Sequence, residues 1–586
     1  MNPNIVEKIS QIERIDYFEY LFDAGNMFQD IVNLSKEYED SEAEKMAVAE
    51  IKVLNLNVYH PIINKNYTSR FDETLVSNKR FSDKEIKYFE HRLTESSNVV
   101  LKSRYSDFIY EYGQGVCSLN KFQIGSQLVN LMLQTANMHF INANPINGLD
   151  DLARAFYVSL QLKNKTMIGH CNELLFEFLT NLEESNLRWV LESAKISRNV
   201  VLSPLSESFG SAKQQVVLEK LELARSYYWE TQEHHLHRSV CKELIEWSKV
   251  NKSDQSEYIT VIGASFEAEA EHQQGREHKS ELVKASFLER ALQHYMDFGF
   301  SEHFDDLKIR IRTAYELAIA NGEFKLISSS GYISQEAIEV AIQPFLQLSL
   351  ENAIMHFGSE IMFIPNIDRV ETNTKDQMHS FSFSNLARKS VVSDGKKIFQ
   401  AIDDNDSYKM NFNQNYMREI QTVGNIIMLP LIEKLIEKGL NATHVMNSLR
   451  SWGNINKESE SLIKIGIEKF FENDYVSSMH ILVPQLEALV RNFFGRIGYA
   501  TTVIKKGTVQ QEQTFNEFLE RKDIKSSMPK KIHKYLSFLL VEKTGCNFRN
   551  RIAHGLIHPA ECNMTNNIRI LHLYLLMTNF TLEEEK

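Results

Sequence analysis

The residue types best suited to catalysis lie near the end of the sequence, between Cys546 and Gly555. Arg549, Asn550 and His554 bring a guanidinium, an amide and an imidazole within six positions. A histidine titrates near neutrality and can move a proton to or from a ribose hydroxyl, while an arginine stabilises the negative charge that builds on a phosphorane. This set of residue types suits phosphodiester chemistry without a metal. The alternative is a helix-terminal histidine beside a surface arginine.

A short helix is predicted to position these side chains. Asn547 is a candidate N-cap and Gly555 a candidate C-terminal stop, so the residues between them make about two turns. At about 100° per residue, Asn550 and His554 lie on one face, and Arg549 lies about 140° round from His554. The three side chains can then converge on one anion, and the helix dipole favours a protonated imidazole at that end.

The run Arg-Asn-x-x-x-His-Gly follows a polar helix start and precedes a strongly apolar helix, and it resembles the active-site motif of the HEPN superfamily of α-helical ribonuclease domains. A second stretch, His480 to Arg491, resembles the helix that packs behind this motif in a HEPN-containing family. The resemblance covers Val476 to Phe580. It implies that residues 412–586 form a HEPN-type helical domain and that Arg549, Asn550 and His554 are catalytic.

The resemblance also implies a biological setting. HEPN ribonucleases usually form homodimers in which two motif helices face each other. Many bacterial members serve as toxins or as effectors of antiviral defence and abortive infection. We therefore expect a metal-independent endoribonuclease, a hydrolase-class nuclease that binds RNA and dimerises through its C-terminal domain. The rival hypothesis is a non-catalytic helical scaffold whose HEPN-like domain binds RNA or protein.

Glu487 lies four residues before Arg491 on the same predicted helix. One interpretation is an ordinary surface ion pair, which contributes a few tenths of a kcal/mol. The other is a carboxylate behind the active site that orients Arg549. The sequence leaves both open.

A basic segment leads into the motif. From Arg496 to Arg551 there are 12 Lys or Arg and five Asp or Glu, so this segment carries +7 and the rest of the chain −19 of the net −12. Such a segment is typical of a surface that binds a phosphate backbone, although it could also be a solvated face. The residues that we expect to bind RNA are Lys530, Lys531, Lys534 and Arg551.

Composition predicts a mostly helical, cytoplasmic protein. The 586 residues include only 10 Pro and 23 Gly, and the five Cys are far apart, without a metal-binding or disulfide pattern. No signal peptide and no run long enough to cross a membrane is found. The sequence contains no nucleotide-binding fingerprint, so we expect no cofactor and no metal.

The pattern along the chain predicts three regions before residues 412–586. Residues 1–145 are predicted to be helical, and 146–357 resemble an irregular tetratricopeptide-like repeat, which would offer a surface to a trigger or regulatory protein. Residues 358–411 are predicted to be a linker that includes Phe381 to Phe383 and a small β-hairpin with an Asp-Gly turn at 394–395. The last helix, near 563–581, is apolar nearly all round, which places it in the core or against a second subunit.

Overall fold

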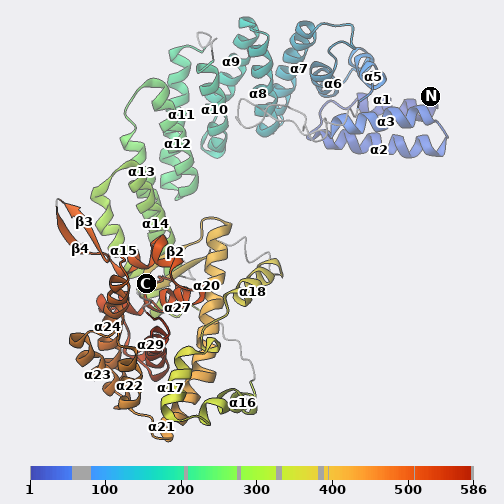
Figure 1. The fold of residues 1–586 in the computed structure, drawn as a ribbon. Helices are drawn as coiled ribbons and strands as arrows, with labels where there is room; N and C mark the ends of the chain where they lie inside the picture. The colour runs from blue at the N-terminus through green and yellow to red at the C-terminus, as the bar shows by residue number, and fades with distance from the viewer. Residues whose placement is uncertain are drawn as a thin grey trace. The chain divides into compact units, whose positions relative to one another are not determined.

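The structure is a computed structural model that describes residues 2–55, 81–203, 209–272, 279–324, 333–380, 389–393, 395–506 and 508–581. These residues are mainly helical and include two small antiparallel sheets, each of two strands (Figure 1). The predicted all-α class is confirmed. The chain forms two compact units, Met1–Ile311 and Arg312–Lys586.

In the first unit, helices pack mainly against their neighbours in sequence, such as α7 with α8 and α13 with α14. Side chains of Asp, Asn or Ser cap many of their N-termini; Ser82, for example, forms a capping box with Glu85 of α5. The helices are α1 (Pro3–Glu13), α2 (Leu21–Glu37), α3 (Ser41–Leu54), α5 (Asp83–Glu95), α6 (Val99–Tyr112), α7 (Lys121–Ile141), α8 (Pro145–Gln161), α9 (Lys165–Thr180), η1 (Glu184–Trp189), α10 (Val190–Val201), α11 (Ser211–Glu230), α12 (His234–Asn251), α13 (Ser256–His272), α14 (Glu281–Phe298), η4 (Ser301–His303) and α15 (Phe304–Ala320), which crosses into the second unit.

Small residues beside aromatic ones allow these helix pairs to approach closely. A Cβ atom added at Gly263 of α13 would lie 2.2 Å from Cζ of Tyr295 on α14. Ala224 of α11 and Ala291 of α14 are fully buried. Small residues thus lie where these helices pack together, and the predicted boundary at 145/146 falls at the start of α8, inside this unit.

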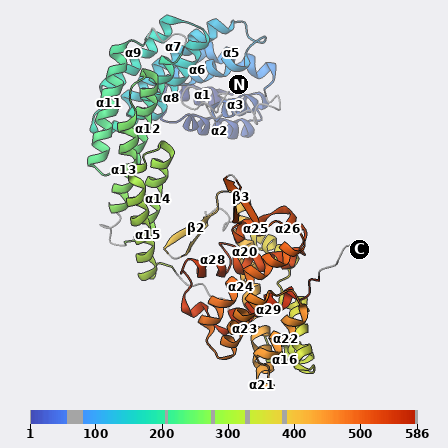
Figure 2. The same cartoon turned by 60° about the vertical axis from the view of Figure 1, so that its left-hand side comes forward.

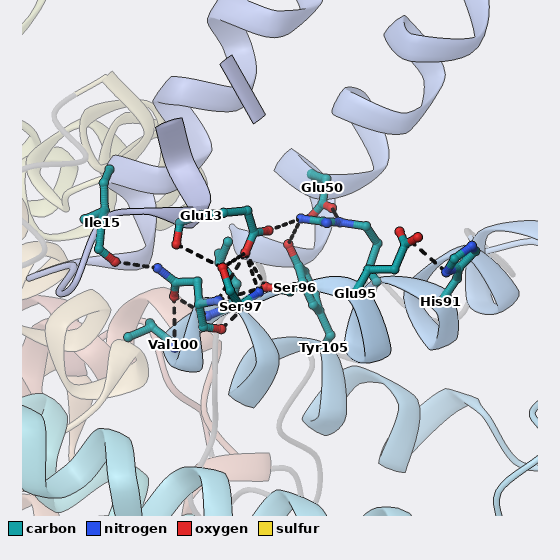
Figure 3. Close-up of polar contacts among 12 residues, drawn as sticks. Glu13, Ile15, Glu50, His91, Glu95, Ser96, Ser97, Val100 and Tyr105 are labelled. Carbon is teal, nitrogen blue, oxygen red and sulfur yellow. Dashed lines mark hydrogen bonds and ion pairs between the residues drawn. The ribbon is translucent and has the colours of Figure 1, made fainter. Parts of the chain in front are cut away.

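A buried ionic network joins the first helices of this unit (Figure 3). Arg92 of α5 donates from Nε to Glu50 of α3 at 2.9 Å and from Nη2 to Glu13 of α1 at 2.6 Å. Burial raises the pKa of Glu50 despite its contact with Arg92. For Glu13, burial opposes ionisation, but hydrogen bonds from Ser96 and Arg92 outweigh it and lower the pKa. One arginine thus ties three helices together.

The second unit contains the motif (Figures 1 and 2). Its elements are α16 (Gln335–Leu346), α17 (Leu350–Ser359), η5 (Ile361–Phe363), α18 (Ile367–Ser380), β1 (Ser390–Ser393), β2 (Lys396–Gln400), α20 (Asp404–Val423), η6 (Gly424–Met428), α21 (Leu429–Glu437), α22 (Ala442–Trp452), α23 (Lys457–Phe471), α24 (Tyr475–Arg496), β3 (Thr502–Lys506), β4 (Val509–Glu512), α25 (Phe515–Glu520), α26 (Lys522–Ser526), α27 (Lys530–Leu540), α28 (Phe548–Ala553), η7 (Pro559–Glu561) and α29 (Met564–Met577).

Helix α29 lies at the centre of the second unit. Every residue from Asn567 to Met577 is buried, and the helix packs against α17, α24 and the η6 turn. Tyr574 donates its hydroxyl hydrogen to the carbonyl oxygen of Leu482 on α24 at 2.7 Å. Of the two predicted places for this helix, the structure shows the core of its own chain, so its apolar surface is not available to a second subunit.

The η6 segment is a π-helical turn between α20 and α21, and Arg569 of α29 lies against it. The Nη2 atom of Arg569 donates to the carbonyl oxygen of Ile420 at 3.1 Å. A Cβ atom added at Gly424 would lie 2.4 Å from that nitrogen. Gly424 is therefore required for this close approach.

The predicted β-hairpin is confirmed as β1–β2, with Gly395 at φ +69° in the turn. The predicted linker segment Phe381 to Phe383 lies outside the described residues. The second hairpin, β3–β4, was not predicted. The predicted boundary between 411 and 412 falls inside α20, and the hairpin belongs to the same compact unit as the motif.

None of the helices in the described ranges is long and apolar enough to cross a membrane.

Candidate active site

The motif helix α28 is shorter than predicted and begins differently. Asn547 precedes it in the left-handed conformation, at φ +52°, and its side chain caps no helix N–H. The Oδ1 atom of Asn547 instead accepts from Nδ2 of Asn550 at 2.7 Å. The predicted N-cap role of Asn547 is therefore wrong. His554 follows the last helical residue and donates its backbone N–H to the carbonyl oxygen of Asn550 at 3.0 Å, and Gly555 turns the chain away at φ +64°.

Arg549 is held from behind by Glu487 of α24. Its Nε donates to Glu487 Oε2 at 2.6 Å and its Nη2 to Oε1 at 3.4 Å. This pairing uses one edge of the guanidinium and leaves the Nη1 side toward Asn550, whose Oδ1 accepts from Nη1 at 3.1 Å. A guanidinium has five N–H groups, so an oxyanion can still be bound.

Glu487 makes the contact that each of its two interpretations requires, one with Arg491 and one with Arg549. Its Oε1 atom also accepts from Nη2 of Arg491 at 2.9 Å, as expected of an i, i+4 pair. This is not an exposed pair, because the Arg491 side chain is 10% exposed and stacks over the rings of Phe515 and Phe518. Glu487 is therefore a carboxylate shared by a structural arginine and the motif arginine.

Asn550 is fixed at the centre of a small amide network. Its Nδ2 atom donates to Asn547, to Oδ1 of Asn516 at 3.2 Å and, at 3.5 Å, to the carbonyl oxygen of Val541. Because its oxygen accepts from Arg549, the amide orientation is determined by its partners. Asn550 thus orients the Nη1 side of the guanidinium, which is turned away from Glu487.

One pocket of about 890 Å³ brings the three motif residues together. Its wall on the motif side includes an exposed His554 beside Arg549 and Asn550. Residues of the β1–β2 hairpin, which is drawn near α28 in Figure 2, line the same pocket. The lining residues are Val391, Val392, Ser393, Lys396, Lys397, Ile398, Thr514, Asn516, Lys543, Thr544, Gly545, Asn547, Arg549, Asn550, Arg551, His554 and Leu556.

The pocket is basic. Three lysines and two arginines line it together with His554, and none of the described residues in its wall carries a carboxylate. The side chain of Arg551 is held by Glu561 and by the carbonyl oxygen of Leu556, so its charge is partly compensated. Such a lining favours an anionic ligand with several charges.

The three lysines predicted to bind RNA lie on α27, outside the lining of this pocket. Lys530 is exposed and pairs with Glu371 at 3.3 Å, and Lys531 is half-buried. Lys534 packs over the rings of Phe412, Tyr416 and Phe538 and donates to Asn413 at 3.2 Å. Burial lowers the pKa of Lys534. Its ammonium group is thus part of the packing between α20 and α27.

Sequence reasoning missed Lys396, Lys397 and Lys543 as pocket residues. A pair of lysines directly after an Asp-Gly turn was visible, but nothing local shows that the hairpin lies against a motif that is 150 residues away in sequence. Lys543 was part of the basic segment but was not singled out.

The cysteines are free thiols, and burial raises the pKa of Cys546, beside the motif, to about 11. Within the part of the chain that the structure describes, no three His, Cys, Asp or Glu side chains gather as metal ligands would. Comparisons of the chain with models of known protein families, with curated proteins and with solved structures found no match.

Proposed function

We propose that the second unit is a HEPN-type, metal-independent endoribonuclease whose active site is the pocket at α28. The observation that carries this proposal is the convergence of Arg549, Asn550 and His554 on one pocket with three lysines in its wall. The substrate is RNA, because this chemistry uses a ribose 2′-hydroxyl as the nucleophile. A cytosolic location, where free thiols persist, belongs to the same proposal.

The proposed reaction is an internal transesterification. His554 takes the proton from the 2′-hydroxyl, the O2′–P bond forms, and the P–O5′ bond breaks. The departing O5′ receives a proton from water and His554 returns its proton to the solvent, so the products are a 2′,3′-cyclic phosphate and a 5′-hydroxyl. Arg549 binds the non-bridging oxygens, whose negative charge grows in the transition state. Asn550 and Glu487 hold that guanidinium in place.

The first experiment compares His554→Ala and Arg549→Ala with the unaltered protein on a labelled single-stranded RNA. Each variant should lose about 10²- to 10⁴-fold in cleavage rate, as expected for a general base or an oxyanion-binding group. His480→Ala and Arg450→Ala are matched controls, because both residues lie on exposed surfaces of the same unit outside the pocket. Cleavage should persist in EDTA and leave a cyclic phosphate.

Loss of cleavage on chelation would contradict the metal-independent mechanism. If the unaltered protein binds RNA without cutting it, the non-catalytic scaffold is the correct function. Growth of cells expressing the unaltered protein or His554→Ala tests a role as a toxin or defence effector, since only the active enzyme should arrest growth.

A homodimer through the second unit is also part of the proposal, because HEPN ribonucleases usually pair two motifs. The support for this dimer is the resemblance alone. The apolar final helix does not support it, because α29 is buried in its own chain. Sedimentation of the full chain measures the state directly, and a fully active monomer would contradict the dimer.

A further inference from the structure

Part of the wall of the active-site pocket comes from the β1–β2 hairpin. Lys396, Lys397 and Ile398 of β2 line the pocket together with Val391 and Val392 of β1. Two cationic and three aliphatic residues of the hairpin thus belong to the same pocket as Arg549 and His554. The hairpin is more than 150 residues from the motif in sequence and is absent from the stretch that resembles HEPN domains.

The base of the hairpin is fastened to the motif wall. The backbone N–H of Ala401 donates to Lys389 at 2.9 Å and closes the hairpin. The Lys389 ammonium donates to Asn411 of α20 at 2.9 Å, and two residues further along α20, Asn413 donates to Thr544 in the pocket wall at 2.6 Å. The two walls therefore share α20 as a common support.

The cationic residues of the lining come from three segments of the chain. Lys396 and Lys397 lie on the hairpin, Lys543 lies in the segment before α28, and Arg549 lies on α28 itself. A polynucleotide presents a phosphate at every residue and can use several such cations at once. The aliphatic residues of the same lining can contact bases, as mixed basic and apolar surfaces do when they bind single strands.

We propose that the β1–β2 hairpin is a clamp for single-stranded RNA, in which Lys396 and Lys397 bind backbone phosphates beside the one at Arg549. The proposal rests on the proposed function for its choice of RNA. A pocket of about 890 Å³ between two walls has the size of sites that enclose a small ligand, so it takes an extended strand of a few nucleotides and not a duplex. Base-paired RNA also hides the base faces that the aliphatic side chains would contact.

Binding is tested in the full chain with His554→Ala, which keeps the RNA intact. Fluorescence anisotropy with a labelled single-stranded oligoribonucleotide is measured across salt concentrations. Lys396→Gln with Lys397→Gln should reduce the slope of log K against log salt by about 1.4, which corresponds to about 25-fold weaker binding at 0.1 M salt. Lys434→Gln with Lys464→Gln is the matched control, because these substitutions remove the same amount of charge from α21 and α23, outside the pocket.

An unchanged salt slope in the hairpin variant, or an equal loss in the control, overturns the clamp. Equal affinity for a duplex of the same sequence overturns the single-strand assignment, and full competition by a mononucleotide at comparable concentration shows a nucleotide site instead. Cleavage is measured separately with His554 present. If the hairpin variant has a smaller salt slope but the protein with His554 does not cleave RNA, the proposed function is contradicted and the clamp is supported. If the protein cleaves RNA but the hairpin variant has an unchanged salt slope, the proposed function is supported and the clamp is contradicted.

Discussion

At the scale of single residues, the shared carboxylate of Glu487 is the feature on which the motif depends most. It accepts hydrogen bonds from Arg491 and Arg549 and is only 15% exposed. Two guanidinium groups would face each other without it. Burial of this kind makes an ion pair stronger than the usual surface pair, and removal of one partner costs more.

A double-mutant cycle with Glu487→Gln and Arg549→Ala should therefore show a coupling energy of about 1–2 kcal/mol in urea unfolding. The pair Arg450–Glu460, at 2.7 Å and with side chains 49% and 31% exposed, is the comparison and should couple by less than about 0.5 kcal/mol. Additive effects at Glu487 and Arg549 would show that the contact contributes nothing to stability.

His572 makes the stability of the second unit sensitive to acid. It is fully buried in α29 among the rings of Phe357, Phe363 and Tyr535, and burial lowers its pKa to about 3. The unfolded chain takes up this proton near pH 6.5, so the contribution of His572 is complete above that pH. It is lost as the pH falls toward 3, by up to about 5 kcal/mol.

Urea unfolding of the full chain at pH 7 and pH 4 measures this loss. His572→Phe, which keeps an aromatic ring without a proton site, should lose less stability between these two pH values than the unaltered chain. The exposed His480→Ala should lose as much as the unaltered chain. Identical losses in all three proteins would rule out His572 as the acid-sensitive group.

At the scale of elements, the π-helical turn and α29 constrain each other through one glycine. Gly424→Ala would place a methyl group 2.4 Å from the Arg569 guanidinium, so the arginine or the turn must move. We expect a loss of about 1–3 kcal/mol in the free energy of unfolding. Gly495→Ala on α24, where the new atom would meet only Thr501 at 3.7 Å, should be neutral or slightly stabilising. Equal effects at both positions would show that Arg569 adapts without cost.

Elements with a strong local sequence pattern could be predicted from the sequence, whereas elements whose conformation depends on tertiary contacts could not. Helices such as α24 and α29 carry long apolar stripes, and the Asp-Gly turn specifies β1–β2. The β3–β4 hairpin is short and polar on β4, where every residue is exposed, so no alternation marks it. Asn547 has the composition of an N-cap, but its left-handed backbone and its bond to Asn550 depend on the surrounding fold.

The same division applies to the site. Arg549, Asn550 and His554 lie on one short helix and directly after it, and they could be identified from the local motif that they form. The sequence left two interpretations of Glu487 open, because its distance to Arg549 depends on the packing of α24 against α28. Lys396 and Lys397 required the tertiary structure, because no sequence pattern links the hairpin to the motif.

At the scale of the whole molecule, the net charge is confined to one unit. Met1–Ile311 has 34 Lys or Arg against 46 Asp or Glu, a balance of −12, whereas Arg312–Lys586 has 31 of each. A polyanion is repelled by the first unit wherever it lies within the range of the field, which is about 10 Å at 0.1 M salt. The first unit should therefore weaken RNA binding.

Residues 312–586 expressed alone should bind single-stranded RNA a few-fold more tightly than the full chain at low salt, and the difference should vanish near 0.5 M salt. The cut at 312 follows the boundary between the two compact units, which lies inside α15, whereas a start at 412 would remove α17 from its contact with α29. A cooperative thermal transition must first show that the fragment folds. Equal affinities at low salt would mean that the first unit has no electrostatic effect on the site.

The central position of α29 also has a consequence for the order of synthesis. Every other described element of the second unit is translated before this helix, and α17, α21, α22, α23, α24 and η6 pack against it. At about 5–20 residues per second, a ribosome needs roughly 10 to 50 seconds to pass from Arg312 to Met577. During that interval the nascent chain exposes the apolar walls that will receive α29, and it is open to chaperones and proteases. If the proposed function is correct, the pocket at α28 is completed only after α29 has been added, and an unfinished chain is expected not to cut the RNA that encodes it.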